Sequence, residues 1–174
     1  MKIINIIEED FVNYKKPAMV ILMPYCSGKC NIGYEKPVCH NYHLHESQLM
    51  EVSIETLGDR YLNNDITKAI VFQGLEPFDS EQDLLEFVRY LRIDKECKDD
   101  IVIYTGYTKE EMESGNYGRT KEEFGNPCGY NELKKFSNVI VKFGRFIPDR
   151  PHFFDPILGI ELASDNQFAE VAGL

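Results

Sequence analysis

The sequence AMVILM at residues 18–23 is a continuous apolar run, long enough for one β-strand. Strands that are covered on both faces are apolar at every position, whereas strands with one wet face alternate between apolar and polar residues. The run therefore predicts a strand buried on both faces. Similar short runs occupy residues 69–72, 101–104 and 139–143, and a weaker strand pattern occupies residues 168–171.

Helical patterns separate these predicted strands. Ser53 is placed to cap a first helix with one apolar stripe, and Ser80 with Asp83 resembles a capping box at the start of a second helix. A third, shorter helix is predicted over residues 131–136. Residues 113–129 are rich in Gly and Asn, which favours a loop.

Strands that alternate with helices favour an α/β fold with a mostly parallel sheet, in which ligands bind beyond the carboxyl ends of the strands. The chain has 174 residues, which suits a single domain over residues 1–174. A closed eightfold barrel needs about 250 residues. We therefore expect an open, partial (β/α) barrel.

The composition narrows the kinds of partner. The formal net charge is −10, whereas binding to nucleic acids or to anionic membranes requires clustered Lys and Arg. No apolar stretch approaches the roughly 20 residues that span a bilayer, and the apolar start of the chain is too short for a signal peptide. We expect a cytoplasmic protein that binds neither nucleic acid nor membrane. In that reducing compartment, its five cysteines are better candidates for metal or redox chemistry than for disulfides.

A loop rich in potential metal ligands follows the first predicted strand. It contains three cysteines and three histidines, namely Cys26, Cys30, Cys39, His40, His43 and His45. Three thiolates around a four-iron cluster would leave one iron open to a small chelating molecule. A zinc site of three cysteines and one histidine is the competing interpretation. Buried cysteines without a metal fit less well, because the loop is polar and offers them no apolar core.

Two further motifs follow predicted strands, VFQGLEPFD at residues 71–79 and IYTGY at residues 103–107. Read with the cysteine loop, they resemble the radical S-adenosylmethionine enzymes. The order of five short motifs resembles most closely the activating proteins of class III anaerobic ribonucleotide reductases. The five motifs are the cysteine loop ending in CHN at residues 39–41, GLEP at 74–77, TGY at 105–107, GRFI at 144–147 and SDNQ at 164–167.

The sequence departs from the usual pattern of that family in three places. The family's cysteines are spaced CxxxCxxC, whereas eight residues separate Cys30 from Cys39 here. Leu75 stands where the family has the second glycine of a GGEP motif. The N-terminal GPG segment that the family often has is not found in this sequence.

The resemblance implies a function and a set of site residues. Cys26, Cys30 and Cys39 would hold a 4Fe-4S cluster, and Gly74, Glu76, Thr105 and Gly106 would contact S-adenosylmethionine. An electron from the cluster would cleave this cofactor to a 5'-deoxyadenosyl radical, which would generate a glycyl radical on the large subunit of an anaerobic ribonucleotide reductase. A donor such as flavodoxin or ferredoxin would reduce the cluster.

Two alternatives stay open from the sequence: a radical enzyme that acts on another peptide or small molecule, and a zinc-binding module without catalysis. Cys97 and Cys128 have no ligand pattern around them, and Cys128 is a candidate fourth ligand only for the zinc site. Asn166 and Gln167 are expected at the far rim of the site, within a turn sequence. His152 is expected to be a surface or packing residue.

Overall fold

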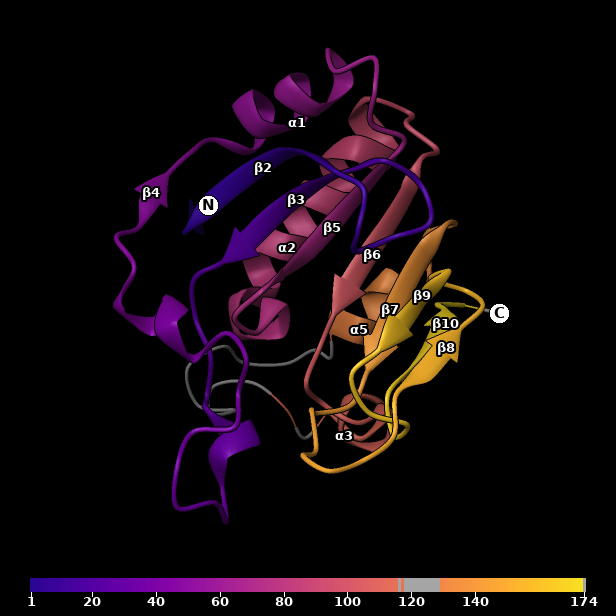
Figure 1. Ribbon diagram of the computed structural model, residues 1–174. Helices are drawn as coiled ribbons and strands as arrows, with labels where there is room; N and C mark the ends of the chain where they lie inside the picture. Colours follow the sequence, from indigo (N-terminus) through magenta and orange to yellow (C-terminus); the bar gives the residue numbers. More distant parts are fainter. Residues whose placement is uncertain (116, 118–128, 174) are drawn as a thin grey trace.

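The computed structural model describes residues 1–115, 117 and 129–173. Its centre is a six-stranded sheet with the strand order β10-β7-β6-β5-β3-β2 (Figure 1). The four inner strands run parallel, and β2 and β10 pair antiparallel at the two edges. The strands are β2 (Asn5–Asp10), β3 (Ala18–Met23), β5 (Ala69–Gly74), β6 (Asp100–Tyr104), β7 (Val139–Phe143) and β10 (Phe168–Val171).

The register of the parallel strands aligns their carboxyl ends. Met23 at the end of β3 pairs with Gly74 at the end of β5, and Tyr104 at the end of β6 pairs with Lys142 of β7. Adjacent parallel strands release their following segments at the same edge of the sheet. The segments after β3, β5, β6 and β7 therefore come together in space.

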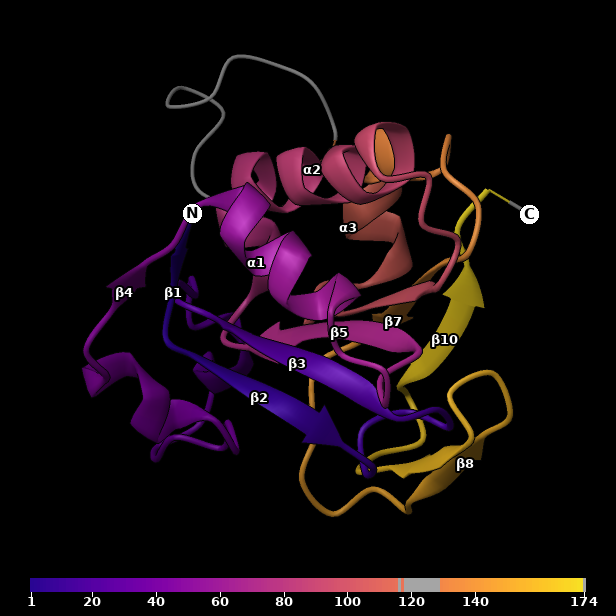
Figure 2. The same ribbon diagram turned by 90° about the horizontal axis from the view of Figure 1, so that it is seen from above.

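Helices cover one face of the sheet, as Figure 2 shows for α1, α2 and α3. They pack on the larger of two apolar cores, in which Phe87 of α2 meets Phe72 of β5 edge to face with ring centroids 5.4 Å apart. The helical elements on this side are α1 (Ile54–Leu62), η3 (Pro77–Ser80), α2 (Glu81–Arg89), the π-helical turn η4 (Tyr90–Asp94), α3 (Lys109–Glu113) and α5 (Gly129–Leu133).

A hairpin of two short strands, β8 (Phe153–Asp155) and β9 (Ile160–Leu162), lies against the opposite face. Its Leu158 and Leu162 pack with valines of β3, β5 and β6 in the second core. A separate small ladder joins β1 (Lys2–Ile3) to β4 (Met50–Glu51). The inner strands are therefore covered on both faces, which explains their continuous apolar sequence.

Asp155 anchors the hairpin to the rest of the sheet. One of its carboxylate oxygens accepts hydrogen bonds from the amides of Ile157 and Leu158, each at 2.9 Å. The other oxygen accepts from the amide of Ala169 in β10 at 2.7 Å. Because Asp155 is only 2% exposed, these three amides supply the hydrogen bonds that a buried carboxylate needs.

The predicted strands agree with the observed ones. The bounds of β3, β7 and β10 are those expected, whereas β5 continues to Gly74 and β6 begins at Asp100. The first helix is α1, and the Ser53 side chain caps it by accepting from the amide of Thr56. Continuous apolar runs and a capping serine were therefore sufficient to place these elements.

The predicted capping box at Ser80 is wrong. The Ser80 side chain makes no cap hydrogen bond, because the chain already turns in η3, where Glu76 accepts from the amide of Phe78. The third helix, α5, covers residues 129–133 rather than 131–136. In the predicted loop over 113–129, residues 116 and 118–128 lie outside the described part of the chain.

The strands β1, β2, β4, β8 and β9 and the helix α3 were not predicted. Most of them are very short, and β2 alternates between exposed and half-buried residues. None of the helices in the described part of the chain is both long and apolar enough to cross a bilayer.

We predict that Asp155→Ala lowers the free energy of unfolding by about 2–4 kcal/mol, because three amides, two of them buried, lose their acceptor. Chemical denaturation followed by circular dichroism measures this change. Asp165→Ala is the matched control, since Asp165 is exposed and forms only a surface ion pair with Arg150; it should cost under about 1 kcal/mol. Equal effects of the two substitutions would contradict the anchoring role of Asp155.

Candidate functional site

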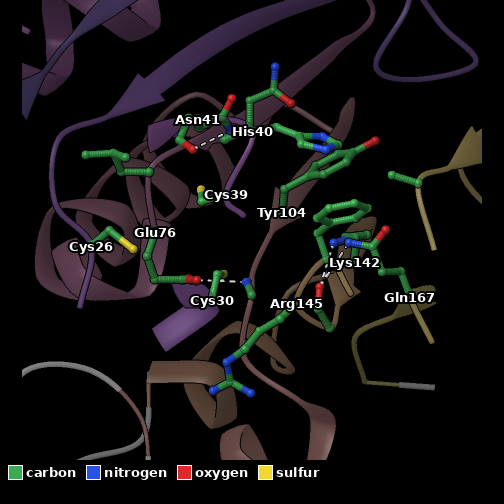
Figure 3. A pocket seen from close by; sticks show the side chains of 17 residues that line it. Cys26, Cys30, Cys39, His40, Asn41, Glu76, Tyr104, Lys142, Arg145 and Gln167 are labelled. Atoms are coloured by element: carbon green, nitrogen blue, oxygen red, sulfur yellow. Dashed lines mark hydrogen bonds between the residues drawn. The ribbon is translucent and has the colours of Figure 1, made fainter. Parts of the chain in front are cut away.

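A pocket of about 170 Å³ opens at the carboxyl edge of the parallel strands (Figure 3). The segments that follow β3, β5, β6 and β7 line it, together with the chain just before β10. Its polar and charged lining side chains include Cys26, Cys30, Cys39, His40, Asn41, Glu76, Lys142, Arg145 and Gln167. The predicted site residues Gly74 and Gly106 also line the pocket, whereas Thr105 lies behind it and is 1% exposed.

Hydrogen bonds fix the first part of the cysteine loop. Gly28 has a φ of 70°, a left-handed conformation that suits glycine, and its N–H donates to the sulfur of Cys26 at 3.3 Å. The amide of Ser27 donates to one oxygen of buried Asp79, and the hydroxyl of Tyr107 donates to the other, both at 2.6 Å. The cysteine loop is thereby tied to the segment that follows β6.

Asn31 brings Cys39 back to the start of the loop. Asn31 ends the short turn η1 (Lys29–Asn31), and its side-chain oxygen accepts from the amides of Val38 at 2.9 Å and Cys39 at 3.2 Å. Cys39 consequently lies beside Cys30, and the two thiols form a hydrogen bond. The eight-residue spacing therefore does not separate these sulfurs in space.

The environment gives the three thiols different pKa values. Burial raises the pKa of Cys26 to about 11. The hydrogen bond from Cys30 stabilises the thiolate of Cys39 and lowers the pKa of Cys39 to about 6, and the same bond raises the pKa of Cys30. A metal centre that binds thiolates would displace the protons of Cys26 and Cys30.

Glu76 is a buried carboxylate between the cysteine loop and β6. It is 6% exposed and accepts from the hydroxyl of Thr105 and the amide of Gly106, both at 2.8 Å, and from the amide of Phe78 at 3.2 Å. Burial raises its pKa to about 7 in spite of these bonds. The structure thus joins three predicted site residues, but the hydroxyl of Thr105 faces Glu76 rather than the pocket.

The two predicted glycines have different local requirements. Gly74 has a φ of 95°, and a side chain there would come within 3.2 Å of the backbone of Leu22 and Met23. At Gly106 an added Cβ would lie 3.5 Å from the sulfur of Cys30, so the glycine keeps this part of the pocket open. Leu75, which stands where the resembling family has glycine, is buried and lines the pocket.

The pocket lining also contains two cationic side chains that were not predicted as site residues. Lys142 is 6% exposed and donates to the carbonyl of Gly144 at 2.8 Å, and burial lowers its pKa to about 8. None of the described carboxylates lies within ion-pair distance of Lys142. Arg145, in contrast, pairs with Glu111 at 2.7 Å. The available signal was a lysine inside VIVKF, an otherwise apolar strand.

The histidines of the cysteine loop do not complete a mononuclear site. His40 lines the pocket and packs on Phe146 with ring centroids 4.2 Å apart, while His43 and His45 lie in the turn η2 (Tyr42–Glu46). Over the described ranges, no three Cys, His, Asp or Glu side chains are arranged to hold one metal ion. In a four-iron cluster each thiolate binds a different iron, so its ligands need not surround a single atom.

The other selected residues occupy different positions. Gln167 lines the pocket as expected, whereas Asn166 is not part of the lining and donates to the backbone of the segment after β7. Cys97 follows η4, away from the pocket lining, and Cys128 lies outside the described residues. His152 is exposed, as predicted. The four described cysteines form no disulfide.

We predict that Glu76 makes stability fall as pH rises from about 5 to about 7. Its folded pKa of about 7 exceeds the ordinary value of 4.5, so the folded chain retains a proton that the unfolded chain releases in this range. Unfolding free energies at several pH values measure the effect. Glu76→Gln should remove about 2–3 kcal/mol of this pH-dependent decrease, and identical pH slopes for the two proteins would contradict it.

The comparison with known protein families agrees with the donor set of the pocket. Residues 18–147 match the family described as 4Fe-4S single cluster domain, a range that contains the cysteine loop and the four parallel strands. No curated protein and no solved structure matches the chain. Three thiols that face one pocket without a disulfide fit an iron-sulfur cluster. The match favours the cluster over the zinc site that composition left open, and the chain belongs to the 4Fe-4S single cluster domain family.

Proposed function

We propose that this protein is a radical S-adenosylmethionine enzyme that generates a glycyl radical on a partner anaerobic ribonucleotide reductase. The observation that carries the proposal is one pocket that combines three thiols with two buried groups of opposite charge, Glu76 and Lys142. Burial of a charged group is unfavourable unless a partner compensates for it. Such groups beside a cluster site therefore favour a ligand that carries both an anion and a cation.

Cys26, Cys30 and Cys39 are the cluster ligands in this proposal. Three protein ligands on a four-iron cluster leave one iron free to bind a small molecule. When bound, the cluster and S-adenosylmethionine supply the chemistry, a reductive cleavage that yields a 5'-deoxyadenosyl radical able to remove a hydrogen atom from glycine. The chain itself contributes the binding, the orientation and the exclusion of water.

Glu76 and Lys142 suit the two charged ends of an amino acid. Glu76 already accepts three hydrogen bonds, and a carboxylate has about four acceptor positions, so one position remains for an ammonium group. Lys142 donates to a single carbonyl, and two of its three protons remain for a carboxylate. The methionine part of S-adenosylmethionine offers both groups.

The remaining predicted residues act through these contacts. Thr105 holds the Glu76 carboxylate with a hydrogen bond of 2.8 Å, so we assign it a positioning role rather than a contact with the adenosyl group. Gly106 donates its amide to Glu76 and leaves space beside Cys30. Gly74 shapes the turn after β5 through its positive φ.

The sheet supports an open, partial (β/α) barrel. Four parallel strands follow one another in chain order, and their connecting helices lie on one face (Figure 2). A closed barrel needs about twice as many strands. An open sheet edge leaves room for a loop of a second protein, which is where the glycine of a reductase large subunit would enter. A donor such as flavodoxin or ferredoxin would supply the electron.

We predict that Cys26→Ala, Cys30→Ala and Cys39→Ala each abolish or strongly reduce cluster binding, because each removes one of three thiolate ligands. Iron and sulfide analysis after anaerobic reconstitution, together with visible absorption, measures the loss. Cys97→Ala is the matched control and should keep the wild-type iron content, since Cys97 does not line the pocket. A full cluster in any of the three ligand variants would contradict the assignment.

We predict that the cluster-loaded protein, given a strong reductant and S-adenosylmethionine, forms 5'-deoxyadenosine. Lys142→Met should weaken binding of S-adenosylmethionine about tenfold or more, because it removes a charge-assisted hydrogen bond. Lys109→Met is the control. Lys109 is more exposed than Lys142 and pairs with Glu170, so this change should leave that affinity unchanged. No 5'-deoxyadenosine from cluster-loaded protein would refute the enzymatic proposal.

The partner is tested separately by electron paramagnetic resonance. Incubation of the active protein with an anaerobic ribonucleotide reductase should produce the spectrum of a glycyl radical in the reductase. If 5'-deoxyadenosine forms but no glycyl radical appears in the reductase, the substrate is another peptide or a small molecule. This outcome would refute the proposed partner and leave the radical chemistry in place.

A further inference from the structure

The side chain of Asn31 connects two parts of the cysteine loop that are distant in sequence. Its oxygen accepts from the amides of Val38 and Cys39, at 2.9 and 3.2 Å. An amide oxygen has two lone pairs, so both bonds form at one atom. The backbone that leads into Cys39 is therefore held against the residue that directly follows Cys30.

Backbone hydrogen bonds fix Asn31 independently of these contacts. Its amide donates to the carbonyl of Gly28 at 3.0 Å, and its own carbonyl accepts from the amide of Tyr34 at 3.3 Å. Gly33, with a φ of 88°, permits the turn that follows. Asn31 thus occupies a defined position between two consecutive turns, from which its side chain reaches the returning chain.

The six residues between Asn31 and Val38 form an excursion that projects from the surface and returns to it. Residues 32–37 are all exposed, whereas Asn31, Val38 and Cys39 are partly buried. Without residues 32–37, the loop would read Cys30-Asn31-Val38-Cys39, with two residues between the cysteines. This two-residue separation is common among cysteines that bind iron-sulfur clusters.

We propose that Asn31 is a positioning residue that closes the excursion of residues 32–37 at its base. By holding the amides of Val38 and Cys39, it places Cys39 where the second cysteine of a pair with only two intervening residues would lie. The excursion is then not required for cluster binding. This inference concerns the binding of the 4Fe-4S cluster and is independent of the chemistry on S-adenosylmethionine.

The first experiment compares Asn31→Ala with Asn31→Asp in the cluster-loaded full chain. The alanine lacks the acceptor, whereas the aspartate keeps an oxygen at the same position. Iron loss to an excess of chelator under anaerobic conditions should be about tenfold faster for Asn31→Ala than for wild type, in line with two lost hydrogen bonds. Asn31→Asp should remain within about twofold of wild type. Equal rates for the two variants would overturn the proposal.

A thermal melt of each metal-free variant separates positioning from general stability. The metal-free Asn31→Ala chain should unfold at the wild-type temperature, since the hydrogen bonds of Asn31 in the described part of the chain all stay within its own loop. Rapid iron loss with an unchanged unfolding temperature supports the positioning role. If the loss of iron instead follows a general fall in the unfolding temperature, the positioning role is refuted.

A second experiment deletes residues 32–37 and joins Asn31 to Val38. The shortened chain should retain its cluster, because the peptide bond between Asn31 and Val38 then holds Cys39 near Cys30. In the full chain the side chain of Asn31 holds Cys39 there. In this shortened chain Asn31→Ala should change the rate of iron loss by less than about twofold, so the two changes are not additive. A tenfold effect of Asn31→Ala in the shortened chain would overturn the inference. Both experiments read iron rather than 5'-deoxyadenosine, so their failure is distinguishable from failure of the proposed function.

Discussion

The alignment of four parallel strand ends at one edge of the sheet is the constraint on which the site depends. Hydrogen-bonded register places Met23 beside Gly74 and Tyr104 beside Lys142. The segments that follow these strands therefore lie next to one another at that edge. Apolar cores on both faces hold the strands in this register, because a slip of one residue would turn the core side chains of a strand to its other face. The cysteine loop, Glu76 and Lys142 share a pocket for this reason.

The pocket contains two buried ionisable side chains, Glu76 and Lys142, whose burial needs an explanation. Glu76 and Lys142 are each 6% exposed, and the pKa of each is shifted toward its neutral form by desolvation. A purely structural pocket would be more stable with apolar side chains at these positions. Shifted acids and bases that surround a cluster site are instead typical of a site that binds a charged ligand. The hydrogen bonds from Thr105 and Gly106 hold the carboxylate of Glu76 in place.

The cysteine loop shows how side chains compensate for an unusual sequence spacing. Asp79 holds Ser27 at the first turn, and Asn31 holds Cys39 at the point where the loop returns. Each uses a side-chain oxygen to satisfy a backbone amide, so the loop is ordered although it has little regular secondary structure. The sulfurs of Cys30 and Cys39 are adjacent as a result. The arrangement of the thiols in this protein is therefore a property of the whole loop rather than of the cysteine spacing alone.

Local pattern in the sequence determined the inner strands, the Ser53-capped helix and the cysteine-rich loop after the first of these strands, since apolar runs, capping residues and clustered thiols act over a few neighbouring residues. The resemblance to radical S-adenosylmethionine enzymes selected Gly74, Glu76 and Gly106 as site residues, and all three line the pocket. Only the tertiary structure decided that Thr105 faces Glu76, that Lys142 and Arg145 enter the pocket, and that Asp155 anchors the hairpin to β10. The cap at Ser80 failed for the same reason, because a turn set by Glu76 precedes the helix. These outcomes depend on contacts between residues far apart in the chain, or on burial, and neither is encoded in the spacing of adjacent residues.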